Sequence, residues 1–195
     1  MLLAVATVAT AWSGYQASRW SAETTKATMR GTAARVESTR ASDLANAQAQ
    51  IDVAVFTQWA DAYASGNKLL RDFYFKRFRP EFKPAVVAWI AARPLRNPNA
   101  PLTPFAMPQY TSKARDDAAR LETQADAWAA TARRNVQRST NYVLGVVMFA
   151  AALFFAGMST KLPSRRLRIA MLTIGVVVFV CTLAWIATSP VSVSV

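Results

Sequence analysis

Apolar residues are concentrated in three stretches that contain no charged side chain, at 1–18, 139–160 and 169–195. A helix rises about 1.5 Å per residue, so about 20 apolar residues cross a hydrocarbon core of about 30 Å. Residues 141–160 and 169–189 meet this requirement with few polar side chains. The pattern therefore predicts a transmembrane helix at each of these two positions.

The first apolar stretch predicts a weaker transmembrane helix over residues 1–20. It is rich in alanine and threonine and is barely long enough to cross a bilayer. A cleaved signal peptide is the alternative, with a small-residue cleavage site at 4–6 or 9–11. Because no basic residue and too few apolar residues precede either site, we expect this helix to be retained.

The segment between the first two spans has the composition of helices. Residues 21–66 contain no proline and are dominated by alanine, glutamine, glutamate, arginine and lysine, which favours one long helix. Its loose apolar stripe consists of Met29, Ala33, Val36, Ala47, Ile51, Val55 and Ala62. Residues 112–140 predict a return helix with a heptad-like seam typical of a coiled coil. This seam consists of Ala114, Ala118, Leu121, Ala125, Trp128, Ala132 and Val136.

Residues 67–111, between the two legs, have a different composition. The part from 69 to 82 is dense in aromatic residues and arginines, and 84–92 is typical of a short helix. Residues 93–108 contain five prolines, which require a largely extended chain. We therefore expect a small proline-rich tip at the end of the two helices.

Together these elements predict an all-α membrane protein, since no alternation typical of strands is visible. Its expected parts are three transmembrane helices, a long antiparallel helical stalk formed by 21–66 and 112–140, and the small helical tip. A basic loop at 161–168 connects the last two spans, and residues 190–195 form a C-terminal tail.

Composition excludes several classes of chemistry. The 195 residues include no histidine and one cysteine, which removes the commonest general base and excludes an intramolecular disulfide or a thiolate zinc cluster. No nucleophile elbow, metalloprotease motif or glycine-rich phosphate loop occurs. The carboxylate pair Glu122 and Asp126 lies one turn apart among basic residues, as on a solvated helix face. We therefore expect no catalytic residues, no metal site, no cofactor and no enzymatic activity.

The basic loop predicts the orientation in the membrane. It carries Lys161, Arg165, Arg166 and Arg168 and no acidic residue, so the positive-inside rule places it in the cytoplasm. Residues 21–140 would then be extracytoplasmic, although basic residues flank the membrane on that side too. The four cations are candidates for contact with anionic lipid headgroups; the alternative is that the loop only fixes the topology.

Basic and aromatic side chains alternate in the first part of the tip. Such a cluster predicts binding of an anionic lipid or cell-wall polymer through charge and stacking. The candidate residues are Arg71, Lys76, Arg77, Arg79, Lys83, Tyr74 and Phe75. The alternative is a small tip core covered by arginine stems. The expected members of that core are Leu70, Phe73, Phe78, Phe82, Val86 and Trp89.

The net charge of +12 is a weak indication of nucleic-acid binding, because the expected location is outside the cytoplasm. In the first span, Thr7, Thr10, Ser13 and Gly14 are candidates for lining a pore or for close helix packing. Hydroxyls bonded to their own backbone are the alternative. No charged residue lies at membrane depth, so we expect no proton relay.

Residues 3–21 (LAVATVATAWSGYQASRWS) resemble the opening of a group of uncharacterised bacterial membrane proteins. Residues 51–59, 78–85 and 154–160 are similar to the same group. The resemblance implies one span, a helical excursion and two closing spans in a bacterial inner membrane. It implies no activity, substrate or site residue, and we expect relatives to have more residues before the first span.

These observations favour a non-enzymatic, three-span membrane protein. We expect it to form a homo-oligomer through its spans and alanine-rich stalk, and to present the tip as a scaffold or as an accessory subunit of an unidentified protein partner. The expected surroundings are the lipid bilayer and its anionic lipids. One alternative is a homo-oligomeric channel whose first span lines the pore. Another is a module that binds anionic lipid or cell-wall polymer.

Overall fold

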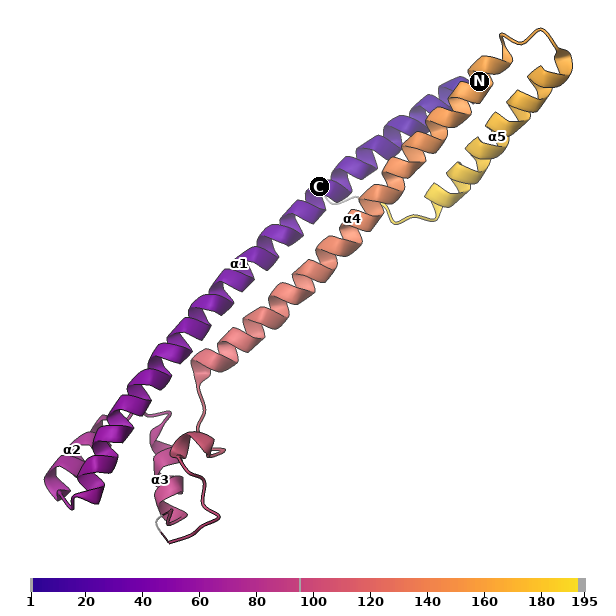
Figure 1. Ribbon diagram of the computed structural model, residues 1–195. Coiled ribbons are helices and arrows are strands. Elements are labelled where there is room, and N and C mark those ends of the chain that lie inside the picture. Colours follow the sequence, from indigo (N-terminus) through magenta and orange to yellow (C-terminus); the bar gives the residue numbers. More distant parts are fainter. Residues whose placement is uncertain (1, 95, 193–195) are drawn as a thin grey trace. The chain divides into compact units, whose positions relative to one another are not determined.

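The computed structural model describes residues 2–94 and 96–192, and it is helical with no strand over this part of the chain (Figure 1). The prediction of an all-α chain is therefore confirmed. Residues 193–195 of the expected tail and Met1 of the expected first span lie outside the described residues. The elements are α1 (Leu2–Ala64), α2 (Lys68–Arg77), α3 (Lys83–Ala91), the 3₁₀ helix η1 (Pro104–Ala106), α4 (Lys113–Ser159) and α5 (Arg165–Ala187).

The chain divides into two compact units. The first unit consists of Met1–Thr32 and Ala125–Val195, and the second consists of Ala33–Gln124. Helices α1 and α4 each contribute residues to both units. Each unit has its own buried cluster of apolar side chains.

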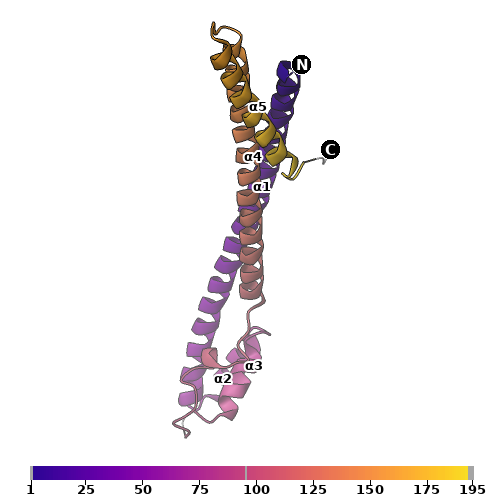
Figure 2. The ribbon, with the colours of Figure 1, turned by 90° about the vertical axis from the view of Figure 1, so that its right-hand side faces the viewer.

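The first unit packs the beginning of α1 against the later part of α4 and against α5. Figures 1 and 2 show α5 beside the end of α4. Two glycines allow this approach: a Cβ at Gly175 would lie 3.1 Å from the Ala152 carbonyl oxygen, and one at Gly145 would overlap the side chain of Ile186. The buried cluster consists of Ala6, Ala17, Trp20, Tyr142, Phe149, Ala152, Phe179 and Ile186.

Helices α4 and α5 are long and apolar enough to cross a membrane. Only 33% of the most apolar stretch of α4 and 22% of that of α5 is buried. Large apolar side chains are exposed instead, among them Val147, Phe154, Val177 and Val180. A core helix of a water-soluble protein would cover such side chains.

The expectation of three apolar spans is wrong in one respect: two described helices, not three, are apolar enough to cross a membrane. The predicted span at 1–20 is the beginning of α1, where Ser13, Gln16 and Arg19 interrupt the apolar residues. Ser13 and Gln16 are fully buried within the first unit. The absence of charge before Arg19 therefore overstated the apolar character of this segment.

Hydrogen bonds attach the chain after α5 to the other two helices of the first unit. The Trp20 indole N–H and the Tyr142 hydroxyl both donate to the Pro190 carbonyl oxygen, at 3.2 Å each. The Ser192 backbone N–H donates to the Gln16 side-chain oxygen at 3.0 Å. Polar side chains on this face of α1 thus find hydrogen-bond partners in the segment that follows α5.

In the second unit, α1 and α4 pair through small side chains. Ala34, Ser38 and Ala45 are buried on α1, opposite the buried Ala114 and Ala118 of the seam expected on α4. The Ser38 hydroxyl donates to the Ala118 carbonyl oxygen at 2.9 Å. Small side chains permit this close approach between the two backbones.

The stripe that the sequence predicts on α1 does not form this contact. Ala33, Val36, Ala47 and Ile51 are exposed, with 56% of Ile51 accessible, and Met29 in the first unit is exposed as well. Val55 is half-buried and Ala62 is buried. Apolar character alone predicts the wrong contact face of α1, because the smallest side chains, and not the most apolar ones, pack against α4. A stripe of larger apolar residues is left uncovered.

Helices α2 and α3 lie beside the end of α1 in the second unit (Figures 1 and 2). The turn after α1 contains Gly66 with φ +73°, a left-handed conformation that glycine adopts at little cost. The Asn67 side chain then accepts a hydrogen bond from the Leu70 backbone N–H at 3.1 Å and caps α2. This reversal returns the chain to the face of α1 that carries Trp59.

Candidate functional site

Aromatic rings form the core of the second unit. Phe82 is fully buried, stacks on Phe105 with ring centroids 4.9 Å apart, and meets the edge of Tyr110. Of the expected tip core, Phe78, Phe82 and Val86 are buried and Trp89 is half-buried, whereas Leu70 and Phe73 are exposed. Through these contacts the proline-rich segment packs against the beginning of α3.

A buried ion pair crosses this core. The Asp52 side chain is 1% exposed and receives two hydrogen bonds from Arg79, Nε to Oδ1 at 3.0 Å and Nη2 to Oδ2 at 2.8 Å. The Tyr110 hydroxyl donates to the same carboxylate at 3.3 Å, and Glu81 accepts from Arg79 Nη1 at 3.0 Å. Arg79 is therefore occupied by internal acceptors.

This arrangement shifts the ionisation of two of its members. The hydrogen bond to Asp52 raises the pKa of Arg79 well above its ordinary value. Burial raises the pKa of Tyr110, and the neighbouring Asp52 carboxylate adds to this effect. At physiological pH the arginine is therefore charged and the tyrosine is neutral. This is expected of a hydrogen-bonded ion pair that stabilises the fold.

The other residues of the predicted anion-binding cluster lie in different surroundings. Arg71 pairs with Asp72 at 2.9 Å, and the Arg77 guanidinium lies 3.5 Å from the centre of the Phe73 ring. The Lys83 ammonium lies over Phe75 at 5.1 Å.

Tyr74 and Phe75 are partly buried against the aromatic core, and Lys76 is exposed. The cluster is therefore divided between core packing and separate surface contacts, and its binding of anions stays a prediction.

A pocket of about 650 Å³ opens between the ends of α1 and α3 in the same unit. Trp59 and Tyr63 line it from α1, Trp89 from α3, and Arg93 and Arg96 from the turn after α3. Its volume falls in the range of about 300–1,000 Å³ that is usual for small-molecule sites. It brings three aromatic rings and two guanidinium groups to one cavity.

The walls of this pocket are held in place. Trp59 and Tyr63 stack with ring centroids 5.1 Å apart, and the Trp89 indole N–H donates to the Pro101 carbonyl oxygen at 2.7 Å. Trp59 is 2% exposed, and its indole N–H has no hydrogen-bond partner among the described residues. A buried donor without an acceptor is uncommon in folded proteins.

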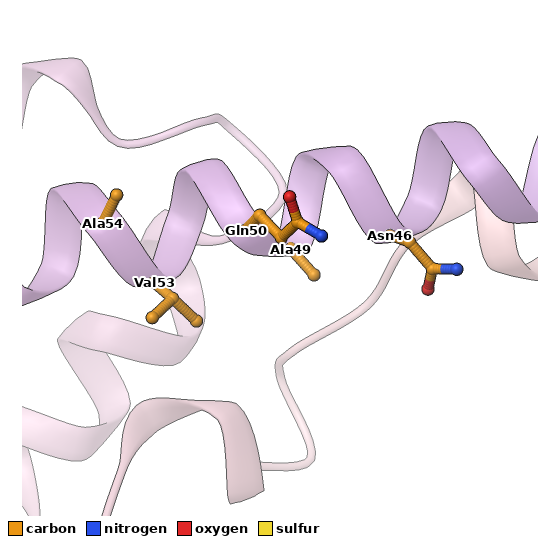
Figure 3. A pocket seen from close by; sticks show the side chains of 5 residues that line it. All are labelled: Asn46, Ala49, Gln50, Val53 and Ala54. Carbon is orange, nitrogen blue, oxygen red and sulfur yellow. The ribbon is translucent and has the colours of Figure 1, made fainter.

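A second hollow, of about 540 Å³, runs along one side of α1 (Figure 3). Its lining comes from α1 alone and consists of Asn46, Ala49, Gln50, Val53 and Ala54. With one helix as its wall and no cation, it offers surface contact rather than an enclosed site.

The basic loop is open to solvent in the first unit. Lys161, Arg165, Arg166 and Arg168 are all exposed, and Arg168 donates to the Leu162 carbonyl oxygen at 3.2 Å. Among the described residues no carboxylate pairs with these four side chains. Their charge is therefore available to an external anion.

The candidate residues of the predicted first span do not share one exposed face. Thr7 is exposed, Thr10 is half-buried and donates to the Ala6 carbonyl oxygen at 2.8 Å, and Ser13 is fully buried. The Ser13 hydroxyl faces Gly145 of α4. Gly14 is exposed, with open space where a Cβ would lie. These positions do not combine into a hydroxyl-lined surface within one chain.

Metal-binding geometry is absent from the described residues: no group of three histidine, cysteine, aspartate or glutamate side chains could hold an ion. Glu122 instead lies 3.3 Å from Arg35 across the helix pair. That the protein uses no cofactor and catalyses no reaction stays a prediction.

Sequence reasoning missed the pocket and the buried ion pair. Asp52 and Arg79 are separated by 27 positions, and Trp59 and Trp89 lie on different helices. The available signal was weak: Trp59 with Tyr63, and Trp89 with Arg93, are pairs spaced by one helical turn. Such pairs become informative once the turn at Gly66 is known to bring the helices together.

In comparisons with protein-family models, curated proteins and solved structures, no match to this chain was found.

Proposed function

We propose that the protein is a non-enzymatic, self-associating scaffold of a bacterial inner membrane. Helices α4 and α5 span the bilayer, the 161–168 loop is cytoplasmic, and residues 21–140 are extracytoplasmic. The bacterial location rests on the resemblance of residues 3–21 to bacterial membrane proteins. The orientation rests on the four exposed cations of the loop.

The apolar surface of α4 and α5 supports the membrane location. These helices pack against each other and α1, yet most of their apolar stretch remains uncovered. Exposed patches of this kind are costly in water but not in hydrocarbon. Near the end of α5, Trp185 is 39% exposed and carries a ring that favours the headgroup region.

The beginning of α1 accompanies the two spans as a third, less apolar membrane helix in this proposal. Its buried face is polar at Ser13 and Gln16, while Val5, Val8, Trp12 and Tyr15 are exposed. An amphipathic helix of this kind needs neighbours to shield its polar groups from hydrocarbon. The exposed apolar side chains supply the lipid-facing surface.

The uncovered stripe of α1 is the observation that carries the proposed self-association. In the second unit, the stripe residues Val36 and Ile51 are exposed by 45% and 56%, and Leu44, two turns before Ile51 on the same face, is exposed by 54%. They lie on a face that neither α4 nor the aromatic core covers. Two copies inserted in the same direction could pair their α1 helices in parallel, so that each stripe residue meets its own counterpart.

Disulfide formation tests this pairing. We would replace the lone Cys181 by alanine, introduce Ile51→Cys or Ser42→Cys, and oxidise native membranes. Ser42 is also exposed and lies nine positions before Ile51, about 180° away around the helix. We expect covalent dimers from Ile51→Cys at least five times more abundant than from Ser42→Cys. Equal yields from the two variants, or no dimer from either, would contradict the pairing.

Anionic lipid is the second partner that a specific observation favours. The loop cations are exposed and have no carboxylate partner among the described residues. Each cation near an anionic membrane surface contributes about 1 kcal/mol of attraction. The loop would thus hold the cytoplasmic end of the α4–α5 hairpin at the headgroup level.

A further inference from the structure

We propose that the pocket between the ends of α1 and α3 binds a small anionic ligand that carries a flat ring. The ring lies against Tyr63 and Trp89, and the acidic group is held by Arg93 and Arg96. This inference concerns a site within the second unit and does not depend on the proposed self-association.

The lining of the pocket selects the charge of the ligand. Arg93 and Arg96 are exposed at its edge, and no carboxylate belongs to the lining. Among the described residues, neither guanidinium forms an ion pair or a side-chain hydrogen bond. Arg79 and Arg71, by contrast, are paired with aspartates. Two unpaired guanidinium groups beside one cavity favour a carboxylate, sulfonate or phosphate.

The aromatic walls select the shape of the ligand. Three rings line one cavity, and two of them are fixed by contacts with their neighbours: Trp59 by stacking on Phe56, and Trp89 by its hydrogen bond to Pro101. Fixed rings bind a flat partner without losing side-chain freedom on association. The unpartnered indole N–H of Trp59 is a buried donor beside the same cavity.

The backbone at Arg93 gives an independent reason to connect this residue with binding. Arg93 has φ +51°, the left-handed conformation in which a helix is usually ended by glycine or asparagine. Its backbone N–H donates to the Ile90 carbonyl oxygen at 3.0 Å and so ends α3. If this position served only to end the helix, glycine would be favoured. An arginine here instead places a guanidinium at the edge of the pocket.

The test uses the full chain in nanodiscs of neutral phosphatidylcholine, with 2-naphthalenesulfonate as the probe and equilibrium dialysis as the readout. Inorganic sulfate and 2-naphthalenemethanol separate the contribution of the charge from that of the ring. We expect the sulfonate to bind at least 10-fold more tightly than either partial probe. Equal binding of the sulfonate and the neutral alcohol would overturn the requirement for an anion.

Substitutions locate the binding. Arg93→Gly combined with Arg96→Gln should weaken sulfonate binding at least 10-fold, and glycine suits the backbone at that position, so α3 should still end there. Lys113→Gln combined with Arg120→Gln removes the same charge from exposed positions on α4, outside the pocket, and should change binding less than twofold. Similar losses in both double variants, or no loss in the first, would overturn the site.

A third variant tests the stacking wall. Tyr63 is 43% exposed, so Tyr63→Ala should leave the core intact. This substitution should weaken binding of the sulfonate about 10-fold, as loss of one stacking ring does elsewhere. Binding of inorganic sulfate should be unchanged. A Tyr63→Ala protein that binds the naphthalene probe as tightly as the parent would contradict the proposed ring position.

Discussion

Asp52 is a buried carboxylate whose two oxygens are occupied by Arg79 and Tyr110. Asp52→Asn would leave the guanidinium in a largely buried place with Glu81 as its remaining anionic partner. Loss of one member of a buried pair costs about 3–5 kcal/mol, and we expect the lower end because Arg79 is 20% exposed. The free energy of unfolding, followed by tryptophan fluorescence during denaturation, measures this loss.

A second aspartate–arginine pair provides the control for this prediction. Asp72 and Arg71 are neighbours on α2, and their side chains are 60% and 37% exposed. Exposed pairs contribute about 0–1 kcal/mol, so Asp72→Asn should change the unfolding free energy by less than about 1 kcal/mol. Equal destabilisation by the two substitutions would show that the Asp52 pair does not hold the second unit together.

Tyr110 makes the second unit sensitive to high pH. Burial and Asp52 raise its pKa above the ordinary value of 10.0, so the folded state retains the phenolic proton where the unfolded state releases it. Stability is therefore fully present below pH 10 and decreases as the pH rises through the raised pKa. Tyr110→Phe should make the denaturation midpoint less dependent on pH above 10 than in the parent. An unchanged dependence would rule out Tyr110 as its cause.

At the scale of single elements, close contact between α4 and α5 depends on Gly175. A side chain there would press on the backbone of Ala152 and Ala156. Gly175→Leu should therefore destabilise the first unit by about 1–3 kcal/mol, the usual cost of overpacking. Thermal unfolding in detergent should begin at a lower temperature.

Gly157 on α4 is the matched control for Gly175. It is also within a helix, but a Cβ there would meet open space. Gly157→Leu should leave the unfolding temperature unchanged or raise it slightly, because leucine favours helix over glycine. If Gly157→Leu lowered the unfolding temperature as much as Gly175→Leu, helix packing would not be the cause.

Element by element, the sequence was informative where the signal is local. Absence of proline and high alanine content predicted long helices, and Gly66 with Asn67 marks the end of α1. The face of α1 was not predictable from apolarity, because Ala34 and Ser38 pair with α4 while Ile51 stays exposed. The pocket depends on residues of two helices and on the left-handed backbone conformation of Arg93. No local sequence pattern indicates that these residues lie close together.

In the whole protein, the proposed topology depends on α4 crossing the bilayer. Two positions lie on either side of it in the sequence: Leu102, which is 93% exposed, and Ser164 in the basic loop. If α4 spans the membrane, cysteines at these positions face opposite compartments. The lone Cys181 must first be replaced by alanine so that each variant carries one thiol.

The most direct measurement is labelling of Leu102→Cys and Ser164→Cys in intact spheroplasts with a membrane-impermeant maleimide. We expect Leu102→Cys to react at once, whereas Ser164→Cys should react only after the membrane is permeabilised. Reaction of Ser164→Cys alone would reverse the orientation and leave the span in place. Reaction of both cysteines in intact spheroplasts, at similar rates, would contradict the claim that α4 crosses the membrane.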